Sequence, residues 1–155
     1  MSFEQRVIDL GLTLPTAPKP VANYIPAVRV GDLIFLSGVL PMKDGHLQST
    51  GKLGREVTVA QGQAAAKQAL LNALAIVRQE MGDLEQVRKI VRLTGHVASH
   101  DGFTEQPAVM NGASDLLVQI FGETGRHARV AVGAAELPLN ASVELEMIVQ
   151  VHSGS

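Results

Sequence analysis

A long helical segment with a single apolar stripe is the feature that most limits what this chain can fold into. Thr58 and Gln61 have the spacing of a capping box, and they predict a helix that ends near Met81, just before Gly82. Apolar residues recur along it at intervals of three and four, namely Ala66, Leu70, Leu74, Val77 and Met81. These residues form one stripe that is expected to be buried.

A second amphipathic helix is expected over residues 103–121. Pro107 suits its first turn, and Gly122 follows its last residue. Its apolar stripe consists of Val109, Ala113, Leu116, Leu117 and Ile120.

The remaining apolar segments have the composition and flanking turns of β-strands. The two-residue link Gly31-Asp32 joins the first two of them and predicts a tight hairpin. A short strand near Leu47 is expected in the turn-rich segment 38–52. The main strands are expected at 27–30, 33–37, 90–97, 128–135 and 143–151. This order of elements predicts an α+β fold, with one mixed sheet and both helices on one face.

The N-terminal segment is expected to lie outside this core. Ser2 and Gln5 have the spacing of a capping box, so a short helix should extend through Asp9 and stop at Gly11. Three prolines then exclude a helix and predict an extended arm, namely Pro15, Pro18 and Pro20.

Length and composition set further limits. The 155 residues suit one domain over 1–155, with the helix and arm at 1–20 and the core at 24–151. A net charge of −2 argues against a nucleic-acid binder or a membrane-surface protein, since both need a basic face. The absence of cysteine excludes thiol catalysis, iron–sulfur clusters, cysteine-ligated zinc and disulfides. Neither a signal-peptide pattern nor a membrane-length apolar run occurs, so we expect a cytoplasmic protein.

The last two strands divide their side chains between two faces, because side chains alternate along a strand. In the last strand the apolar face is assigned to the helices: Val143, Leu145, Met147 and Val149. The opposite face then carries Glu144, Glu146, Ile148 and Gln150. In the preceding strand, the set placed away from the helices is Arg129, Ala131, Gly133 and Ala135. The face away from the helices is therefore either an oligomer interface, which small residues permit, or a solvated face with incidental charges.

Motifs for metal, hydrolase and nucleotide sites are weak. His96 and His100 lie on a strand and its following loop, where a spacing of four does not converge, so with Asp101 they are not expected to form a metal site. The Gly-x-Ser-x-Gly elbow of a Ser-His-Asp hydrolase does not occur. The segment Gly51-Lys52-Leu53-Gly54 lacks the spacing of a phosphate-binding loop.

The segment GRHARVAVGAAELPLNASVELE resembles the signature of the RidA/YjgF family, also called endoribonuclease L-PSP. The signature has an arginine, a Leu-Pro pair eight and nine residues on, and a glutamate fifteen residues on, here Arg129, Leu137, Pro138 and Glu144. Further matches are Tyr24 ahead of the hairpin, the Ser37-Gly38 turn at its end and Asn111 in the second helix. The resemblance covers roughly Tyr24 to Val151, and the N-terminal helix is typical of a longer subgroup.

The resemblance implies a chorismate-mutase-like fold of the bacillary type, assembled as a homotrimer with sites in clefts between subunits. It also implies hydrolytic deamination of reactive imines and enamines, such as 2-aminoacrylate, to 2-keto acids and ammonia. No cofactor and no metal is implied. The implied partners are a small carboxylate or imine substrate and further copies of the chain, with no nucleic acid and no membrane.

Each matched residue has an implied role and an alternative. Arg129 would grip the substrate carboxylate with its planar fork, or form a salt bridge to Glu144 or Glu146 across the sheet. Glu144 would hold the attacking water or shuttle a proton to the leaving ammonia, or form an ion pair between subunits. Tyr24 would close the cleft or hydrogen-bond the substrate, or pack at the hairpin entrance.

The other matched residues are weaker signals. Ser37 and Gly38 would contact the substrate and water through hydroxyl or backbone groups, although a Ser-Gly turn is common. Asn111 would bind the substrate or, equally, a neighbouring loop.

The sequence also departs from the best-known deaminases. Ala131 stands where they have a cysteine, and Val130 where serine is frequent. Water attacks an imine without a thiol nucleophile, so deamination stays feasible, while the substrate and the retention of catalysis are open. Arg126 and His127 are candidates to line the cleft and select another anionic substrate.

The sequence therefore gives three candidate functions, in decreasing order of preference. The first is the cofactor-free imine and enamine deaminase. The second is a non-catalytic module that binds a small carboxylate through Arg129. A ribonuclease ranks last, because a net charge of −2 and one tyrosine make a poor platform for RNA.

Overall fold

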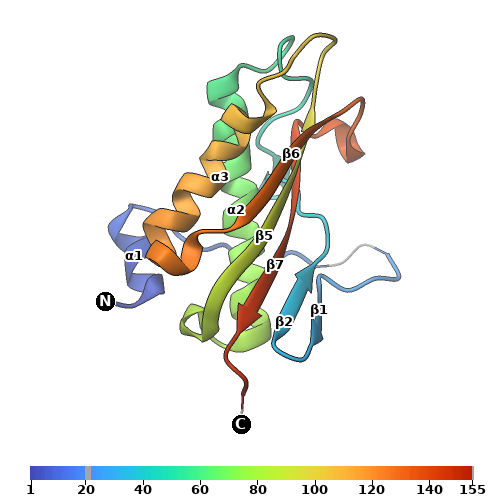
Figure 1. Ribbon diagram of the computed structural model, residues 1–155. Coiled ribbons are helices and arrows are strands. Elements are labelled where there is room, and N and C mark those ends of the chain that lie inside the picture. The colour runs from blue at the N-terminus through green and yellow to red at the C-terminus, as the bar shows by residue number, and fades with distance from the viewer. Residues whose placement is uncertain (20–21, 155) are drawn as a thin grey trace.

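The structure is a computed structural model that describes residues 1–19 and 22–154 (Figure 1). Its helices are α1 (Phe3–Asp9), α2 (Val59–Met81) and α3 (Gln106–Phe121). The main sheet contains β1 (Ala27–Val30), β2 (Leu33–Leu36), β5 (Val87–Ala98), β6 (Ala128–Ala134) and β7 (Val143–Val151). A separate ribbon pairs β3 (Met42–Lys43) with β4 (His46–Leu47), and short 3-10 turns lie at Leu84–Gln86, Gly122–Gly125 and Pro138–Asn140.

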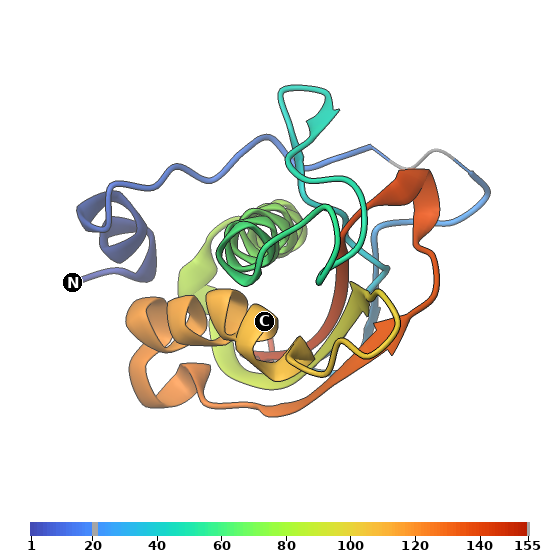
Figure 2. The same ribbon diagram turned by 90° about the horizontal axis from the view of Figure 1, so that it is seen from above.

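The main sheet is mixed and carries its helices on one side. Its strand order is β1-β2-β7-β5-β6, in which β5 and β6 are parallel and the other neighbours are antiparallel. Figures 1 and 2 both show α2 and α3 on the same side of this sheet. The predicted α+β architecture is therefore confirmed. The described helices include none that is both long and apolar enough to cross a membrane.

The predicted start of α2 is confirmed in atomic detail. The Thr58 hydroxyl accepts a hydrogen bond from the Gln61 backbone at 3.2 Å, and the Gln61 side chain accepts one from the Thr58 backbone at 2.9 Å. At α1 the prediction holds only in part. Ser2 caps the helix by accepting from the Gln5 backbone, but the Gln5 side chain donates to Asp9, so the reciprocal half of the capping box is absent.

Two element boundaries differ from the sequence-based expectation. The second long helix begins at Gln106, not at residue 103, because the preceding residues form a turn. The Gln106 side chain closes that turn by donating to the Phe103 carbonyl at 2.8 Å and to the Ser99 hydroxyl at 3.1 Å. Strand β5 is longer than expected at both ends, and it contains two register irregularities where it pairs with β7.

The helix stripes predicted from periodicity form the core. All five stripe residues of α3 are buried, as are four of the five on α2, while Met81 is half-buried. The two helices approach closely at Gly112, where an added Cβ would lie 2.2 Å from the Gln63 carbonyl oxygen. A side chain at this position would therefore separate α2 from α3.

The N-terminal arm runs past α2 and connects α1 to the β1–β2 hairpin (Figure 2). Arg6 anchors α1 by donating to the Ile120 carbonyl of α3 at 2.9 Å. Arg78 of α2 anchors the arm by donating to the Pro15 carbonyl at 3.3 Å. No helix occurs between α1 and residue 19, and Pro20, the last predicted proline of the arm, lies outside the described residues.

The orientation predicted for the strand after α3 is wrong. Arg129 points to the helix side of the sheet, where it contacts Asn111 and Ser114 of α3. Val132 instead lies on the open face, 41% exposed, and pairs with His96, which in turn pairs with Glu144. Strand β6 is at the edge of the sheet, so a polar side chain on its helix side can contact the polar margin of α3 instead of the core.

Candidate functional site

Arg129 is held in place by the helix that packs over β6. Its Nη1 donates to Asn111 Oδ1 at 2.8 Å and to Ser114 Oγ at 3.1 Å. Asn111 and Ser114 are three residues apart on α3, so both side chains lie on the same side of that helix. Two polar groups of one rigid element thus fix one corner of the guanidinium.

His127 extends this network to the backbone. Its Nδ1 lies 2.6 Å from the Gly125 carbonyl oxygen, which can only accept, so Nδ1 donates. In the neutral ring Nε2 is then an acceptor, and it receives the Ser114 hydroxyl proton across 2.9 Å. Ser114 Oγ then accepts the hydrogen bond from Arg129 Nη1 through a lone pair. We call Arg129, Asn111, Ser114 and His127 the arginine cluster.

The arginine cluster leaves one edge of the guanidinium unused. Among the residues that the structure describes, Arg129 Nε and Nη2 have no hydrogen-bond partner. These two nitrogens form the side of the fork that matches the two oxygens of a carboxylate. The arrangement is therefore suited to hold a carboxylate while Nη1 stays fixed to α3.

Glu144 lies at a second location, beside the turn that ends β2. Val39 and Leu145 exchange backbone hydrogen bonds of 2.7 and 3.0 Å, which fixes this turn against β7. Gly38 therefore lies directly over Glu144, and a Cβ on Gly38 would be 3.0 Å from the carboxyl carbon Cδ. A residue with a side chain at this position would displace the carboxylate.

The environment of Glu144 favours its protonated form. Partial burial is the main cause, and the neighbouring carboxylate of Glu146 adds to it, so the pKa of Glu144 is raised above its usual value. His96, opposite Glu144 on β5, opposes the shift. A carboxyl group with a raised pKa is better able to exchange protons near neutral pH.

Tyr24, Ser37 and Gly38 lie together along one cavity. Tyr24 is half exposed, so its ring can contact a molecule that enters from solvent. The Ser37 hydroxyl donates to the Ile25 carbonyl at 2.7 Å, which leaves its oxygen available as an acceptor. We call these three residues and Glu144 the glutamate cluster.

The two clusters do not meet within one chain. Arg129 is on the helix side of β6 and Glu144 is on the open face of β7, with β5 between these strands. The alternative of a salt bridge from Arg129 to Glu144 or Glu146 across the sheet is therefore wrong for the single chain. Residues 1–19 and 22–154 form three ion pairs, and none includes Arg129.

Arg126 and His127, which precede β6, differ in their contacts. Arg126 is exposed and pairs with Glu123 at 3.2 Å, whereas His127 is half-buried and uses both ring nitrogens. Both ring nitrogens of His127 are therefore occupied within the chain, and Ser114 connects this ring to Arg129. Within the described ranges, no three histidine, aspartate or glutamate side chains form a group that could hold a metal.

Sequence reasoning missed the role of Ser114 and the position of His96. The spacing of three between Asn111 and Ser114 was a usable signal, because it puts both on one side of a helix. The pairing of His96 with Glu144 depends on the register between β5 and β7, which no local pattern contains.

Comparisons with known proteins agree on one family. The sequence profile described as "YjgF/chorismate_mutase-like, putative endoribonuclease" matches residues 4–151. Protein TCP17 from Trypanosoma cruzi is 44% identical over 145 residues, which cover 93% of this chain and 91% of that protein. The 2-iminobutanoate/2-iminopropanoate deaminase from Dermatophagoides farinae is 32% identical over 144 residues, with 90% and 94% covered. The crystal structure of Atu1372 from Agrobacterium tumefaciens, a protein with unknown function, has 47% identity and a TM-score of 0.89, with 96% and 91% covered.

Proposed function

The chain belongs to the YjgF/chorismate mutase-like family, and we propose that it hydrolyses reactive 2-imino acids, and the enamines that convert into them, to 2-keto acids and ammonia. The observation that carries this proposal is Arg129, fixed at Nη1 by Asn111 and Ser114 while its Nε and Nη2 edge faces no partner among the described residues. That edge fits the carboxylate that every 2-imino acid carries. The similarity to a 2-iminobutanoate/2-iminopropanoate deaminase supports the reaction type.

The reaction consists of an addition and an elimination. Water adds to the carbon of the C=N bond and its proton passes to nitrogen, giving a carbinolamine. The C–N bond then breaks as the hydroxyl proton is transferred to the departing nitrogen, leaving a 2-keto acid and ammonia. In this proposal Glu144 accepts and returns these protons, a role that its raised pKa favours.

A complete site then requires two copies of the chain. We propose a homotrimer in which Arg129 of one copy faces Glu144 of the next. Two observations support this assembly. Arg129 lies on an edge strand, within reach of a neighbour, and the open face around Glu144 carries exposed apolar residues, including Phe35 and Val132.

A coupled assay tests the deaminase. An amino-acid oxidase generates 2-imino acids in situ, semicarbazide traps them, and the protein competes for the imine. We expect faster keto-acid formation and less trapped imine with the intact chain, and loss of both effects with Arg129→Ala. Arg88→Ala removes an exposed arginine at the start of β5 and serves as the matched control.

Two outcomes would contradict the proposal. One is an equal rate for the intact chain and Arg129→Ala, and the other is no acceleration by a folded protein. In the second case, saturable binding of a 2-keto acid that depends on Arg129 would favour a non-catalytic carboxylate-binding module.

A further inference from the structure

A cavity of about 810 Å³ lies between the N-terminal arm, α2 and the segment that follows β2. Tyr24, Ser37 and Gly38 of the glutamate cluster form one part of its lining. The cavity is therefore continuous with residues that the proposed reaction uses.

The cavity lining is mostly apolar as a whole, and each of its three sides contributes apolar residues beside polar ones such as Lys19, Asp44 and Gln68. The arm contributes Leu12 and Pro15, α2 contributes Leu71 and Ile76, and the segment after β2 contributes Val39 and Met42. Hydrocarbon groups move favourably from water into such surroundings. The lining thus selects for an apolar group.

Hydrogen bonds fix two of these walls to α2. Asn72, only 4% exposed, donates to the Leu40 and Met42 carbonyls, each at 2.9 Å. Arg78 donates to the Pro15 carbonyl of the arm at 3.3 Å. Because both walls are tied to the same helix, the cavity is formed before any ligand enters.

Gly38 connects the cavity to the reacting group. It lines the cavity, and the missing side chain at its Cα faces the Glu144 carboxylate at 3.0 Å. Glu144 itself is not among the residues that line the cavity, so an imine carbon held beside Glu144 must extend its side chain past Gly38 to enter the cavity.

We propose that this cavity binds the substrate side chain and makes the chain selective for 2-imino acids with large apolar side chains, such as those derived from leucine and phenylalanine. Pockets for drug-sized molecules have volumes of roughly 300–1,000 Å³, and the methyl group of 2-iminopropanoate would leave most of this one empty. Neither amino acid has a leaving group on its β-carbon. The reaction that produces these imines is therefore the oxidation of an amino acid by a flavin or nicotinamide enzyme, not an elimination.

This proposal rests on the proposed deaminase, and the same assay with different amino acids tests it. The measured quantity is the ratio of kcat/KM for the leucine-derived imine to kcat/KM for the alanine-derived imine. We expect a ratio well above one for the intact chain. We expect Thr16→Trp, which adds a ring to the cavity lining from the exposed arm, to lower that ratio by roughly tenfold or more.

Controls separate filling of the cavity from other effects. Leu71→Phe fills the cavity from α2 and should shift the ratio in the same direction. Val118→Trp adds the same ring to an exposed position of α3 outside the cavity and should leave the ratio unchanged. A ratio that Thr16→Trp and Leu71→Phe do not alter would overturn the proposal while the deaminase itself stands. A change in the mass of the assembly with Thr16→Trp would also overturn the proposed side-chain site. It would mean that a neighbouring copy of the chain, and not a ligand, occupies the cavity.

Binding of an apolar side chain in the cavity can be tested even if the protein hydrolyses no imine. That result would contradict the proposed function but not the binding site. Titration calorimetry would then compare 4-methyl-2-oxopentanoate with pyruvate. Tighter binding of the larger keto acid by the intact chain, reduced in Thr16→Trp, would support the cavity as its binding site. Equal affinities would rule it out.

Discussion

The guanidinium of Arg129 is oriented by residues that do not face the proposed ligand. Ser114 Oγ accepts from Arg129 and is hydrogen-bonded to His127, which is in turn fixed by the Gly125 carbonyl. A hydrogen bond to a charged group contributes about 1.5–3 kcal/mol, and its loss allows the fork to move. In the proposed reaction, Ser114 and His127 are therefore positioning residues for the arginine that binds the carboxylate.

We expect Ser114→Ala to raise KM for 2-imino acids about tenfold with little change in kcat, because the carboxylate is held less firmly while the reacting groups remain. Ser114→Thr keeps the hydroxyl and should preserve KM. Steady-state kinetics of the three proteins at matched thermal stability measure this difference. An equal loss of kcat in both variants would show instead that residue 114 only supports the fold.

Glu144 should combine a catalytic benefit with a cost in stability. Its pKa is raised mainly by burial, so the folded chain holds this proton more tightly than the unfolded chain does. Ionisation therefore destabilises the fold as the pH rises from the ordinary value of 4.5 through the raised value. The full destabilisation is present once the pH exceeds the raised pKa of Glu144.

We expect Glu144→Gln to lower deaminase activity by about 10²–10⁴-fold and to leave Tm at pH 7 equal to or above that of the intact chain. The Tm advantage should vanish below pH 4, where the native carboxyl is protonated in both states. Thermal unfolding at several pH values and the coupled assay check the two parts separately. A lower Tm at pH 7 would mean that Glu144 has a stabilising ion-pair partner.

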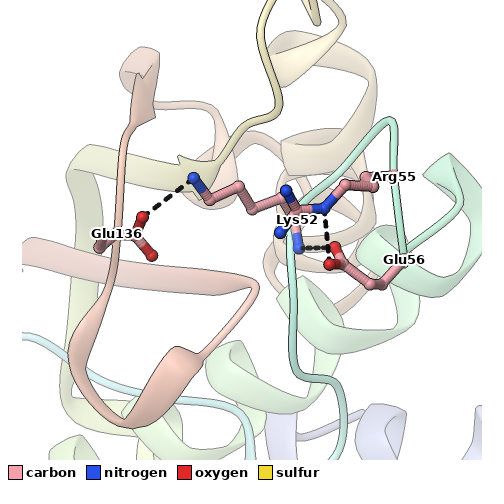
Figure 3. Close-up of polar contacts among 4 residues, drawn as sticks. All are labelled: Lys52, Arg55, Glu56 and Glu136. Carbon is pink, nitrogen blue, oxygen red and sulfur yellow. Dashed lines mark hydrogen bonds and ion pairs between the residues drawn. The ribbon is translucent and has the colours of Figure 1, made fainter.

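At the scale of elements, the loop between β4 and α2 is closed by a single carboxylate. Glu56 accepts from the Lys52 backbone at 2.8 Å and from Arg55 Nε at 2.6 Å (Figure 3). The Lys52 side chain leaves this loop and pairs with Glu136 at 2.9 Å, in the connection between β6 and β7 (Figure 3). The loop thereby links the start of α2 to the connection that precedes Glu144.

The backbone N–H of Lys52 is the main reason that the pKa of Glu56 is lowered from 4.5 to about 2. A lowered pKa means that the ionised group stabilises the fold above pH 4.5 and that this stabilisation is lost as the pH falls from 4.5 to about 2. We expect Glu56→Gln to lower Tm at pH 7, with the difference from the intact chain closing as the pH approaches 2. Glu136→Gln is the control, because a pair whose acid is 72% exposed contributes little. A pH-independent difference in Tm would argue against ionised Glu56 as the cause.

At the scale of the whole molecule, the sheet has one face covered by helices and one open face that carries exposed apolar groups beside the charged residues Glu144 and Glu146. On the open face, Phe35 and Val132 are each 41% exposed and Val28 is 48% exposed. Phe35 pairs with Ile148 of β7. Exposed apolar groups gathered on one face mark an interaction surface. The proposed homotrimer would cover this face and bring the arginine and glutamate clusters together.

We expect light scattering to give three times the 16.4 kDa chain mass, and we expect Phe35→Asp to reduce the mass to that of one chain. Deaminase activity should be lost with the assembly, although Arg129 and Glu144 are unchanged. Val118→Asp adds the same charge to an exposed site on α3 and should alter neither property. A monomeric Phe35→Asp variant with full activity would refute the shared site.

The sequence by itself determined the elements of this protein and most of its core. The helix capped by Thr58 and the last strand, β7, lie where the local pattern predicts, because capping and side-chain periodicity depend on residues only a few positions apart. The family signature likewise consists of residues whose spacing is visible in the chain. These features need no knowledge of distant contacts.

Only the tertiary structure decided which residues face one another. Alternation separates Arg129 from Val130, but it does not say which set faces the helices, and the prediction for β6 was wrong for that reason. The answer depends on the position of β6 at the sheet edge, where α3 offers Asn111 and Ser114 instead of apolar side chains. Strand order and helix placement are long-range properties, and they separate Arg129 from Glu144 in one chain and form the cavity beside Gly38.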